Sequence, residues 1–244
     1  MTRGAKPPSG GPSRTPPGQH LTDKFPVMTA GSPRIAPADD WDLTLSVEAP
    51  DGTLTDLARW DYAAIRALPQ TEIQVDIHCV TRWSKLDTLW RGVTIDDLLR
   101  AAGAEDLVES APPTPSLPLA YLLSHCEGDF TGNLSLKDAL GARAMVALDY
   151  AGAPLPEPHG GPARLLAPHL YFWKSAKWLR RLILSPYDRK GFWEKLGYHN
   201  RGDPWAEQRY RGLDDFDHRK TLDVELSKKI RDERLRAKRD ETGG

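Results

Sequence analysis

The fold of this chain is constrained most by a series of short segments in which apolar and polar residues alternate. Proline or glycine interrupts these segments every few residues. Residues 41–50 alternate with a period of two, as in a half-buried strand, and the Asp51-Gly52 pair predicts a turn into a second strand over 53–57. Further short strands are expected over 71–80, 119–124, 144–150, 163–167 and 178–185. With 21 prolines in 244 residues, the chain has little room for the long helices that alternate with strands in a doubly wound parallel sheet. We therefore expect a β-rich, mixed-sheet α+β domain.

Three short helices are expected between these strands. Asp61 can cap a helix over 61–68, and Thr94 opens a segment that resembles a capping box and ends near Gly103. A third short helix is expected over 135–140. Each helix is too short to form the long elements of a helical bundle, which keeps the prediction β-rich.

The two ends of the chain differ in composition from its centre. Residues 1–24 are rich in proline and glycine with almost nothing apolar to bury, and they predict a disordered leader. Residues 213–244 combine strong helix formers with scattered apolar positions, and they predict a charged terminal helix. A docking arm for an acidic partner is the alternative for this tail. Residues 25–212 are expected to form one domain with a single core.

Charge and hydropathy exclude several classes of protein. The chain carries 33 Lys and Arg against 34 Asp and Glu, a net charge of −1, which gives no overall field to attract nucleic acid or anionic lipid. No apolar run approaches the roughly 20 residues that a membrane span requires, so no integral membrane segment is expected. The N-terminus lacks the apolar stretch of a secretion signal and a twin-arginine pair. We therefore expect a cytoplasmic location.

Cys79 is the residue whose neighbours first suggest chemistry. The sequence contains no G-x-S-x-G, H-E-x-x-H, G-x-x-x-x-G-K-[ST] or G-x-G-x-x-G motif. Cys79 is expected at the end of strand 71–80, where His78, Arg82 and Lys85 could stabilise its thiolate through a positive potential. A thiolate is a soft metal ligand. The alternative is a buried cysteine that packs as a small hydrophobic residue.

A second cluster of polar residues lies further along the chain. The paired glycines that follow His159 permit a close backbone approach to a ligand. Arg164 offers a planar fork for phosphate, while Lys174, Ser175 and Lys177 add positive charge and a hydroxyl. The cluster predicts a site for a phosphorylated, polar ligand. A turn, a strand and a cationic rim without any ligand would give the same sequence pattern.

Five blocks of sequence, in this order, carry a resemblance to a known family. They are FPVMTAG from Phe25, HCVTRWSKLDTLWRGV from His78, HGGPARLLAP from His159, KSAKW from Lys174 and GFWEKLGYHNRGDPW from Gly191. Together they resemble the molybdopterin-binding oxidoreductase domain of the sulfite oxidase family. The resemblance is greatest to small bacterial members related to the catalytic subunit of the methionine sulfoxide reductase system. It extends from about Phe25 to Tyr210.

The resemblance implies Mo-molybdopterin as the cofactor. In that family a cysteine thiolate binds molybdenum beside the two dithiolene sulfurs of the pterin, which implies that Cys79 is the metal ligand and the catalytic residue. His78, Arg82 and Lys85 become candidates to tune the metal, although alternate side chains of a strand point to opposite faces.

Contacts with the pterin are implied for two further groups of residues. His159 and Arg164 are expected to contact the pterin and its phosphate. The residues expected to complete this anchor are Ser175, Ala176 and Lys177. A weaker match assigns Met28 and Thr29 to a segment that approaches the pterin through its main chain, and places Cys126 near a position often occupied by a hydroxyl-bearing residue.

The implied activity is a two-electron oxygen-atom transfer between the metal and a small-molecule substrate. The arginine-rich substrate pocket of true sulfite oxidases is not reproduced in residues 80–83, so sulfite is not the expected substrate. No haem domain or dimerisation domain is expected beside the core domain, so electrons are expected to pass through a separate partner. Two alternatives remain. One is a molybdopterin carrier without turnover. The other is a thiol-redox or zinc module built on Cys79, Cys126 and nearby histidines, although neither cysteine belongs to a C-x-x-C pair.

Overall fold

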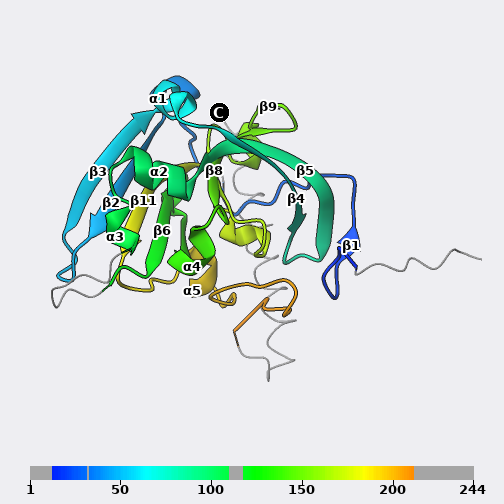
Figure 1. The fold of residues 1–244 in the computed structure, drawn as a ribbon. Helices are drawn as coiled ribbons and strands as arrows, with labels where there is room; N and C mark the ends of the chain where they lie inside the picture. The colour runs from blue at the N-terminus through cyan, green and yellow to red at the C-terminus, as the bar shows by residue number, and fades with distance from the viewer. Residues whose placement is uncertain (1–12, 32, 110–117, 212–244) are drawn as a thin grey trace, which may run out of the picture.

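Two mixed β-sheets form most of the computed structural model, which describes residues 13–31, 33–109 and 118–211 (Figure 1). One sheet has five strands and the other six, and both combine parallel with antiparallel pairs. The predicted β-rich, mixed-sheet α+β class is confirmed. None of the helices in these ranges has the length and apolar character that crossing a membrane requires.

The five-stranded sheet has the order β3-β2-β11-β6-β7. Its strands are β2 (Asp42–Glu48), β3 (Leu54–Asp61), β6 (Tyr121–Cys126), β7 (Thr131–Ser135) and β11 (Leu179–Ser185). The predicted hairpin is β2 with β3, and β11 runs parallel to β2 and antiparallel to β6. Leu43 and Leu45 of β2 are buried on the inner face, as the alternating pattern predicts.

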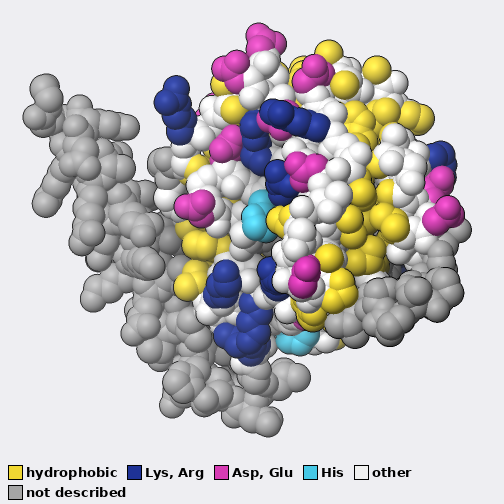
Figure 2. All heavy atoms as spheres, turned by 90° about the vertical axis from the view of Figure 1, so that its left-hand side faces the viewer, with side chains coloured by type: hydrophobic (Ala, Val, Ile, Leu, Met, Phe, Trp, Pro, Cys, Tyr) yellow, Lys and Arg dark blue, Asp and Glu magenta, His cyan; other side chains and the backbone are white. Residues whose placement is uncertain are grey.

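The outer face of this sheet is polar. Seven residues line a shallow depression on it: Asp42, Thr44, Asp56, Arg59, His125, Arg180 and Arg181. Figure 2 views the molecule from the side on which β3 and β2 lie in Figure 1, and it shows basic, acidic and histidine side chains interspersed over this face. Opposite charges lie next to each other on neighbouring strands of this face, as in the ion pair of Arg59 with Asp42.

The six-stranded sheet is built around β5 (Trp83–Thr94), a long strand that curves across the molecule (Figure 1). The other strands are β1 (His20–Leu21), β4 (Thr71–His78), β8 (Met145–Tyr150), β9 (Ala153–Pro154) and β10 (Arg164–Leu166). Strand β5 pairs antiparallel with β4 and β8 and parallel with β1, while β8 also pairs with β9 and β10. The sequence did not predict β5 or β7 as strands.

The helices are short, and two of them, α1 and α2, begin at the capping residues predicted for them, Asp61 and Thr94. They are α1 (Tyr62–Ala67), α2 (Ile95–Ala101), α3 (Asp106–Glu109), α4 (Leu136–Ala139) and α5 (Phe192–Lys195), with 3-10 turns η1 (Ala38–Asp40), η2 (Glu127–Asp129), η3 (Glu157–His159) and η4 (Phe172–Lys174). The side chains of Asp61, Thr94 and Ser135 each accept a hydrogen bond from a backbone N–H of the first turn.

The core is divided into two clusters, rather than forming the single cluster expected from the sequence. Strand β8 serves both, because its side chains alternate between the two faces of the sheet. Val146 and Leu148 belong to the larger cluster, which includes the inner face of the five-stranded sheet. Met145 and Ala147 belong to the smaller cluster, which includes Cys79. The functional site is therefore to be sought on the side of β8 that faces the smaller cluster.

Residues 13–24 pack on the domain, whereas the sequence predicted a disordered leader over 1–24. Strand β1 pairs with the start of β5, and Arg14 lies 2.6 Å from Asp76 and 2.7 Å from Asp87. The prediction rested on a shortage of apolar side chains, but backbone pairing and ion pairs hold this segment instead. Residues 1–12 and the predicted tail over 213–244 lie outside the described residues.

Candidate functional site

Cys79 lies where β4 ends, as predicted, and begins the turn into β5. Its N–H donates to the carbonyl of Trp83 (2.8 Å), and its carbonyl accepts from the N–H of Arg82 (3.0 Å), which has a φ of 74°. The hydroxyl of Thr81 donates to the sulfur at 3.2 Å. Burial raises the pKa of the Cys79 thiol, while the hydrogen bond from Thr81 and the positive charge of Arg209 lower it. The turn thus presents a buried thiol with two features that favour its thiolate.

The thiol lines a cavity of about 190 Å³ beside the smaller core cluster. Eight of the nine predicted site residues line this cavity, namely Met28, Thr29, Cys79, His159, Arg164, Ser175, Ala176 and Lys177. They come from three separate parts of the chain, which the fold brings together. Among the described residues that line the cavity there is no carboxylate, so its basic residues have no acidic counterpart in this part of the chain.

Arg164 forms the buried basic floor of the cavity. Its guanidinium donates to the carbonyl of His159 at 2.6 Å and to the carbonyl of Ser175, and it lies 4.2 Å from the ring centre of Phe172. Burial lowers the pKa of Arg164. Carbonyl oxygens carry only partial charges, so the guanidinium is oriented without being neutralised. Such a group fits an anionic ligand that carries several oxygens.

Lys177 brings a second positive charge next to Arg164. Its ammonium donates to the carbonyl of Pro158 at 3.0 Å, and burial together with Arg164 lowers the pKa of Lys177 to about 7. Gly160 makes this crowding possible, since a Cβ there would lie 3.0 Å from that of Lys177 and 3.1 Å from that of Arg164. The sequence assigned the paired glycines to a close approach by a ligand. In the structure Gly160 admits two basic side chains, and Gly161 packs against the carbonyl of Leu155.

Aromatic side chains form the remaining wall. The ring of Phe25 stacks on His159, with centroids 3.8 Å apart and planes 9° from parallel. Burial, Arg164 and Lys177 lower the pKa of His159, which favours the neutral ring. The indole N–H of Trp83 is buried at the cavity and has no hydrogen-bond partner among the residues that the structure describes. An unpaired buried donor is costly, so the cavity offers a donor to a ligand that carries acceptor atoms.

Three residues predicted to surround the thiol do not line the cavity. His78 shares a hydrogen bond with the hydroxyl of Ser84 at 2.8 Å, and Lys85 donates to the carbonyl of Asp23 at 2.7 Å. Arg82 contributes its backbone to the turn, and its side chain is absent from the cavity lining. The positive charge near the thiol comes instead from Arg209, which the sequence analysis did not identify. Its guanidinium donates to the carbonyl of Val80 at 2.7 Å. Its position far along the chain gave no signal of this contact.

Cys126 lies in the larger core cluster, at the end of β6, and does not line the cavity. Burial raises the pKa of its thiol to about 12, although the nearby charge of Arg164 acts in the opposite direction. Its predicted contact with the pterin stays a prediction. Ser175 lines the cavity, and its hydroxyl accepts from the N–H of Ala167 at 2.9 Å. This bond fixes the segment on which Ala176 and Lys177 follow.

Lys174, expected in the ligand site, instead supports the wall behind it. Its buried ammonium donates to Glu194 at 2.8 Å, to the side chain of Asn133 at 2.7 Å and to the carbonyl of Asn200 at 2.8 Å. Glu194 also accepts from the indole of Trp173 at 3.0 Å. Because Trp173 lines the cavity, this ion pair holds one side of the site.

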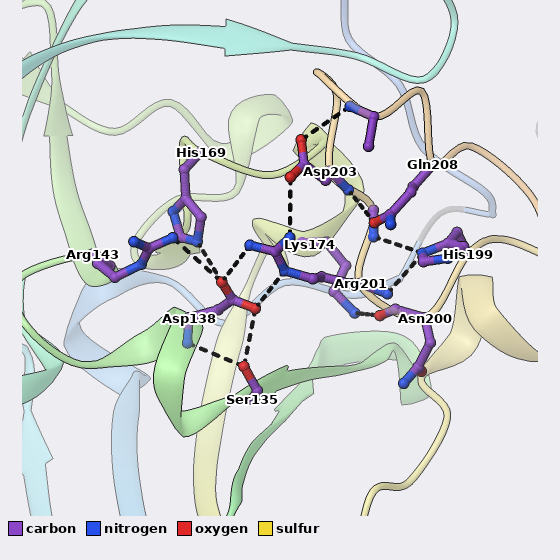
Figure 3. A network of polar contacts seen from close by, with 12 residues as sticks. Ser135, Asp138, Arg143, His169, Lys174, His199, Asn200, Arg201, Asp203 and Gln208 are labelled. Carbon is purple, nitrogen blue, oxygen red and sulfur yellow. Dashed lines mark hydrogen bonds and ion pairs between the residues drawn. The ribbon is translucent and has the colours of Figure 1, made fainter.

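The same wall continues into a network around Asp138 (Figure 3). Arg201 donates to both oxygens of Asp138, at 3.1 and 3.2 Å, and Ser135 donates at 3.0 Å. Burial would raise the pKa of Asp138, but the hydrogen bonds from Arg201 and Ser135 lower it. Gly202 follows Arg201, and a Cβ there would lie 2.7 Å from the ring of Trp173. The network thus fixes the loop against which Trp173 packs.

The fold and this cavity define an oxidoreductase with a molybdopterin-binding domain. The family model described as the oxidoreductase molybdopterin binding domain matches residues 30–193, which is more than half of the chain. The chain therefore belongs to this family, and it is an oxidoreductase of the sulfite oxidase family.

Curated relatives place the chain more closely. It is 38% identical over 198 residues to the uncharacterized oxidoreductase YuiH of Bacillus subtilis (strain 168), covering 81% of this chain and 92% of YuiH. It is 28% identical to a putative protein-methionine-sulfoxide reductase subunit, YedZ1, of Azospira oryzae (73% of this chain, 63% of the relative). It is 26% identical to the protein-methionine-sulfoxide reductase catalytic subunit MsrP of Pseudomonas syringae pv. tomato (74% and 53%). The chain thus spans most of YuiH but only part of the two reductase subunits.

A solved structure shows the same fold. The crystal structure of the sulfane dehydrogenase SoxCD from Paracoccus pantotrophus matches with a TM-score of 0.50 and 16% identity, over 70% of this chain and 46% of that chain. At this identity the likeness concerns the fold alone.

Proposed function

We propose that this chain binds Mo-molybdopterin in the cavity and catalyses a two-electron oxygen-atom transfer on a small-molecule substrate, with electrons exchanged through a separate partner. One observation carries the proposal: the cavity joins a buried thiol, Cys79, to a buried guanidinium, Arg164, and a half-buried ammonium, Lys177, with no carboxylate among the described residues that line it. A soft metal ligand beside an anion site suits a cofactor that combines a metal with a phosphorylated organic group.

Each part of the cavity has a defined task in this proposal. Cys79 would bind the metal, Arg164 and Lys177 would hold the phosphate, and the indole of Trp83 would donate to an acceptor of the pterin. The bound cofactor supplies the two-electron chemistry, and the protein positions it. Cys79 must lose its proton to bind a metal, and the hydroxyl of Thr81 stabilises the resulting thiolate. The aromatic wall would shield one side of the bound cofactor from water.

The substrate and the electron partner are proposed from chemistry and from the relatives. Val80 and Thr81 line the cavity next to Cys79. They offer an apolar side chain and a hydroxyl, and neither of them carries a positive charge. A neutral sulfoxide suits this surface better than sulfite, and two relatives are named as subunits of protein-methionine-sulfoxide reductases. The name of YedZ1 as a subunit also supports a separate redox partner. A cytoplasmic location stays a prediction.

The role of Cys79 is tested by comparing the wild type with Cys79→Ser, after expression in a host that makes the cofactor. Molybdenum and pterin are measured per chain, together with the absorption of the thiolate–metal bond and the turnover of a sulfoxide screen. Cys79→Ser is expected to lose the thiolate–metal absorption and turnover, because serine provides no sulfur. Arg59→Met, which removes an exposed ion pair on the outer face of the five-stranded sheet, is expected to keep both. Identical spectra and activity in Cys79→Ser and wild type would contradict the proposal.

The alternatives are separated by two measurements. A carrier without turnover would keep the pterin, but its metal would be neither reduced by dithionite nor reoxidised by any acceptor. A zinc or thiol-redox module would contain zinc and no molybdenum on elemental analysis. In the part of the chain that the structure describes, no three His, Cys, Asp or Glu side chains are grouped to hold a metal ion.

A further inference from the structure

Two side chains from outside the β4–β5 hairpin hold the turn that carries Cys79. The amide nitrogen of Gln19 donates to the carbonyl of Cys79 at 3.1 Å. The guanidinium of Arg209 donates to the next carbonyl, that of Val80, at 2.7 Å. Gln19 precedes Cys79 by 60 residues and Arg209 follows Val80 by 129. Two adjacent peptide groups are therefore fixed from opposite directions along the chain.

Gln19 belongs to the segment of residues 13–24, which we call the N-terminal strap. The strap runs beside the beginning of β5, where the N–H of His20 donates to the carbonyl of Arg82 at 2.8 Å and the N–H of Thr22 donates to that of Ser84 at 3.0 Å. These two bonds set the position of the strap along the strand. Gln19 immediately precedes His20 in the strap, and from this position its side chain reaches the carbonyl of Cys79.

Arg14 fastens the beginning of the strap across the same hairpin. Its guanidinium donates to Asp76 of β4 and Asp87 of β5, at 2.6 and 2.7 Å. Arg14 and Asp87 are exposed, so salt weakens this contact and it contributes modestly to stability. The contact nevertheless bridges the two strands that flank the turn.

The strap and Arg209 also touch each other. Gly18 has a φ of +66°, and a Cβ there would lie 3.0 Å from a carboxylate oxygen of Glu207 and 3.5 Å from the guanidinium of Arg209. Arg209 itself is buried, and it lies 4.8 Å from the ring centre of Tyr171. The strap therefore turns at a glycine to pass next to Arg209, and the two form one support beneath the turn.

We propose that the strap and Arg209 hold the Cys79 turn in the position that metal binding requires, with Gln19 and Arg209 as positioning residues. The inference rests on the proposed role of Cys79 as the metal ligand. Metal–ligand distances are fixed to within about 0.2 Å, whereas the turn itself is closed by only two backbone bonds, to Arg82 and Trp83. The two outside contacts restrict the movement of the sulfur relative to the basic floor of the cavity.

The first test measures the exposure of the Cys79 thiol in cofactor-free protein. Wild type, Gln19→Leu and Arg209→Met are labelled with a maleimide over a series of pH values, and peptide mapping gives separate rates for Cys79 and Cys126. The rates for Cys79 are compared per thiolate, because removing the charge of Arg209 also raises the pKa of this thiol. Loss of one hydrogen bond is expected to increase the labelling rate of Cys79 about fivefold. The rate of Cys126, buried in the larger core cluster, is expected to stay unchanged.

The matched control is Gln70→Leu. Gln70 also donates from its amide to backbone carbonyls, those of Ile65 and Leu68 at 3.0 Å, but it does not line the cavity. This variant is expected to label Cys79 at the wild-type rate. Unchanged labelling of Cys79 in both Gln19→Leu and Arg209→Met would overturn the inference. An equal increase for Cys126 would overturn it too, because it would indicate general loosening of the protein.

The second test uses cofactor-loaded protein and a spectroscopic signature. Gln19→Leu and Arg209→Met are expected to shift the thiolate–metal absorption band relative to wild type, and Arg209→Lys is expected to restore it in part by donating to Val80. A band unchanged in all variants would overturn the positioning role. If instead Cys79→Ser keeps the wild-type band, the proposed function fails, even where the labelling test shows that the strap holds the turn.

Discussion

The electrostatics of the cavity rest on two residues, Arg164 and Lys177. Arg164 is buried and Lys177 is half-buried, and no carboxylate is among the described residues that line the cavity with them. Burying charge without a partner of opposite sign is unfavourable. An anion bound between them would relieve this cost, so the two residues account for selectivity towards a phosphorylated ligand more directly than the aromatic wall does.

Lys177 predicts a pH dependence of anion binding to cofactor-free protein. With a pKa of about 7, its ammonium is charged below pH 7 and neutral above it. Affinity for sulfate, which does not titrate in this range, is expected to fall by up to about tenfold per pH unit between pH 7 and 8.5. Isothermal titration calorimetry at several pH values measures the fall.

Lys177→Arg is the control for this dependence, because a guanidinium keeps its charge throughout the range. Its affinity for sulfate is expected to stay nearly constant from pH 7 to 8.5. A wild-type affinity that does not change over the same range would show that Lys177 is not the titrating group.

Residues with a distinctive chemistry could be predicted from the sequence, and those that act through position could not. Cys79 and Arg164 were found because a thiol and a guanidinium suggest particular ligands. Phe25 was included only as the start of a matching block, since stacking on His159 arises from the fold. Lys174 shows where prediction from side-chain chemistry alone fails. It carries the same charge as Lys177, but the fold pairs it with Glu194 instead of placing it in the cavity.

At the scale of elements, the buried ion pair of Lys174 and Glu194 joins η4 to α5 behind the cavity. Both side chains are almost completely buried, with exposed fractions of 1% and 2%. Glu194→Gln is expected to lower the free energy of unfolding by about 3–5 kcal/mol, because it leaves an ammonium buried without its carboxylate. Urea denaturation measures the change.

A double-mutant cycle separates the interaction energy between Lys174 and Glu194 from the contributions of their other contacts. Lys174→Met combined with Glu194→Gln is expected to cost less than the sum of the single variants, because the double variant leaves no unpaired charge, whereas each single variant leaves one. Arg59→Met, which removes an exposed ion pair on the outer sheet face, is expected to leave stability unchanged. Additive effects in the buried pair would argue that the two side chains do not interact.

Strands with one buried face were predicted, and the strand that organises the sheet was not. Strand β2 alternates clearly because its outer face is polar. Strand β5 pairs with three other strands and has register shifts opposite β4 and β8. Its apolar residues therefore do not follow a period of two, which hides the strand from sequence patterns. Capping residues such as Thr94 were predicted correctly because their bonds are local.

On the scale of the whole molecule, the cavity lies beside the smaller core cluster, and its occupancy is expected to affect global stability. A ligand present at about 100 times its dissociation constant adds roughly 2.7 kcal/mol to the free energy of unfolding. For a domain of this size that corresponds to an increase of about 5–10 °C in Tm. Differential scanning fluorimetry of loaded and cofactor-free protein tests this expectation.

Arg164→Met provides the comparison for the thermal measurement. This variant removes the buried guanidinium, so it is expected to retain less pterin after expression in the same host. Its Tm should then differ little between preparations with and without the cofactor. A wild-type Tm that is equal in both states would mean that the cofactor does not contribute to the stability of the fold.

The hydrogen bonds of Gln19 and Arg209 to neighbouring carbonyls have a consequence for biosynthesis. A ribosome releases the strap and the Cys79 turn well before it has made Arg209, so the turn passes much of translation with only one of its two supports. A cofactor that entered a nascent chain at this stage would meet a Cys79 turn without its contact to Arg209. If metal binding requires both contacts, cofactor loading would have to follow the synthesis of Arg209.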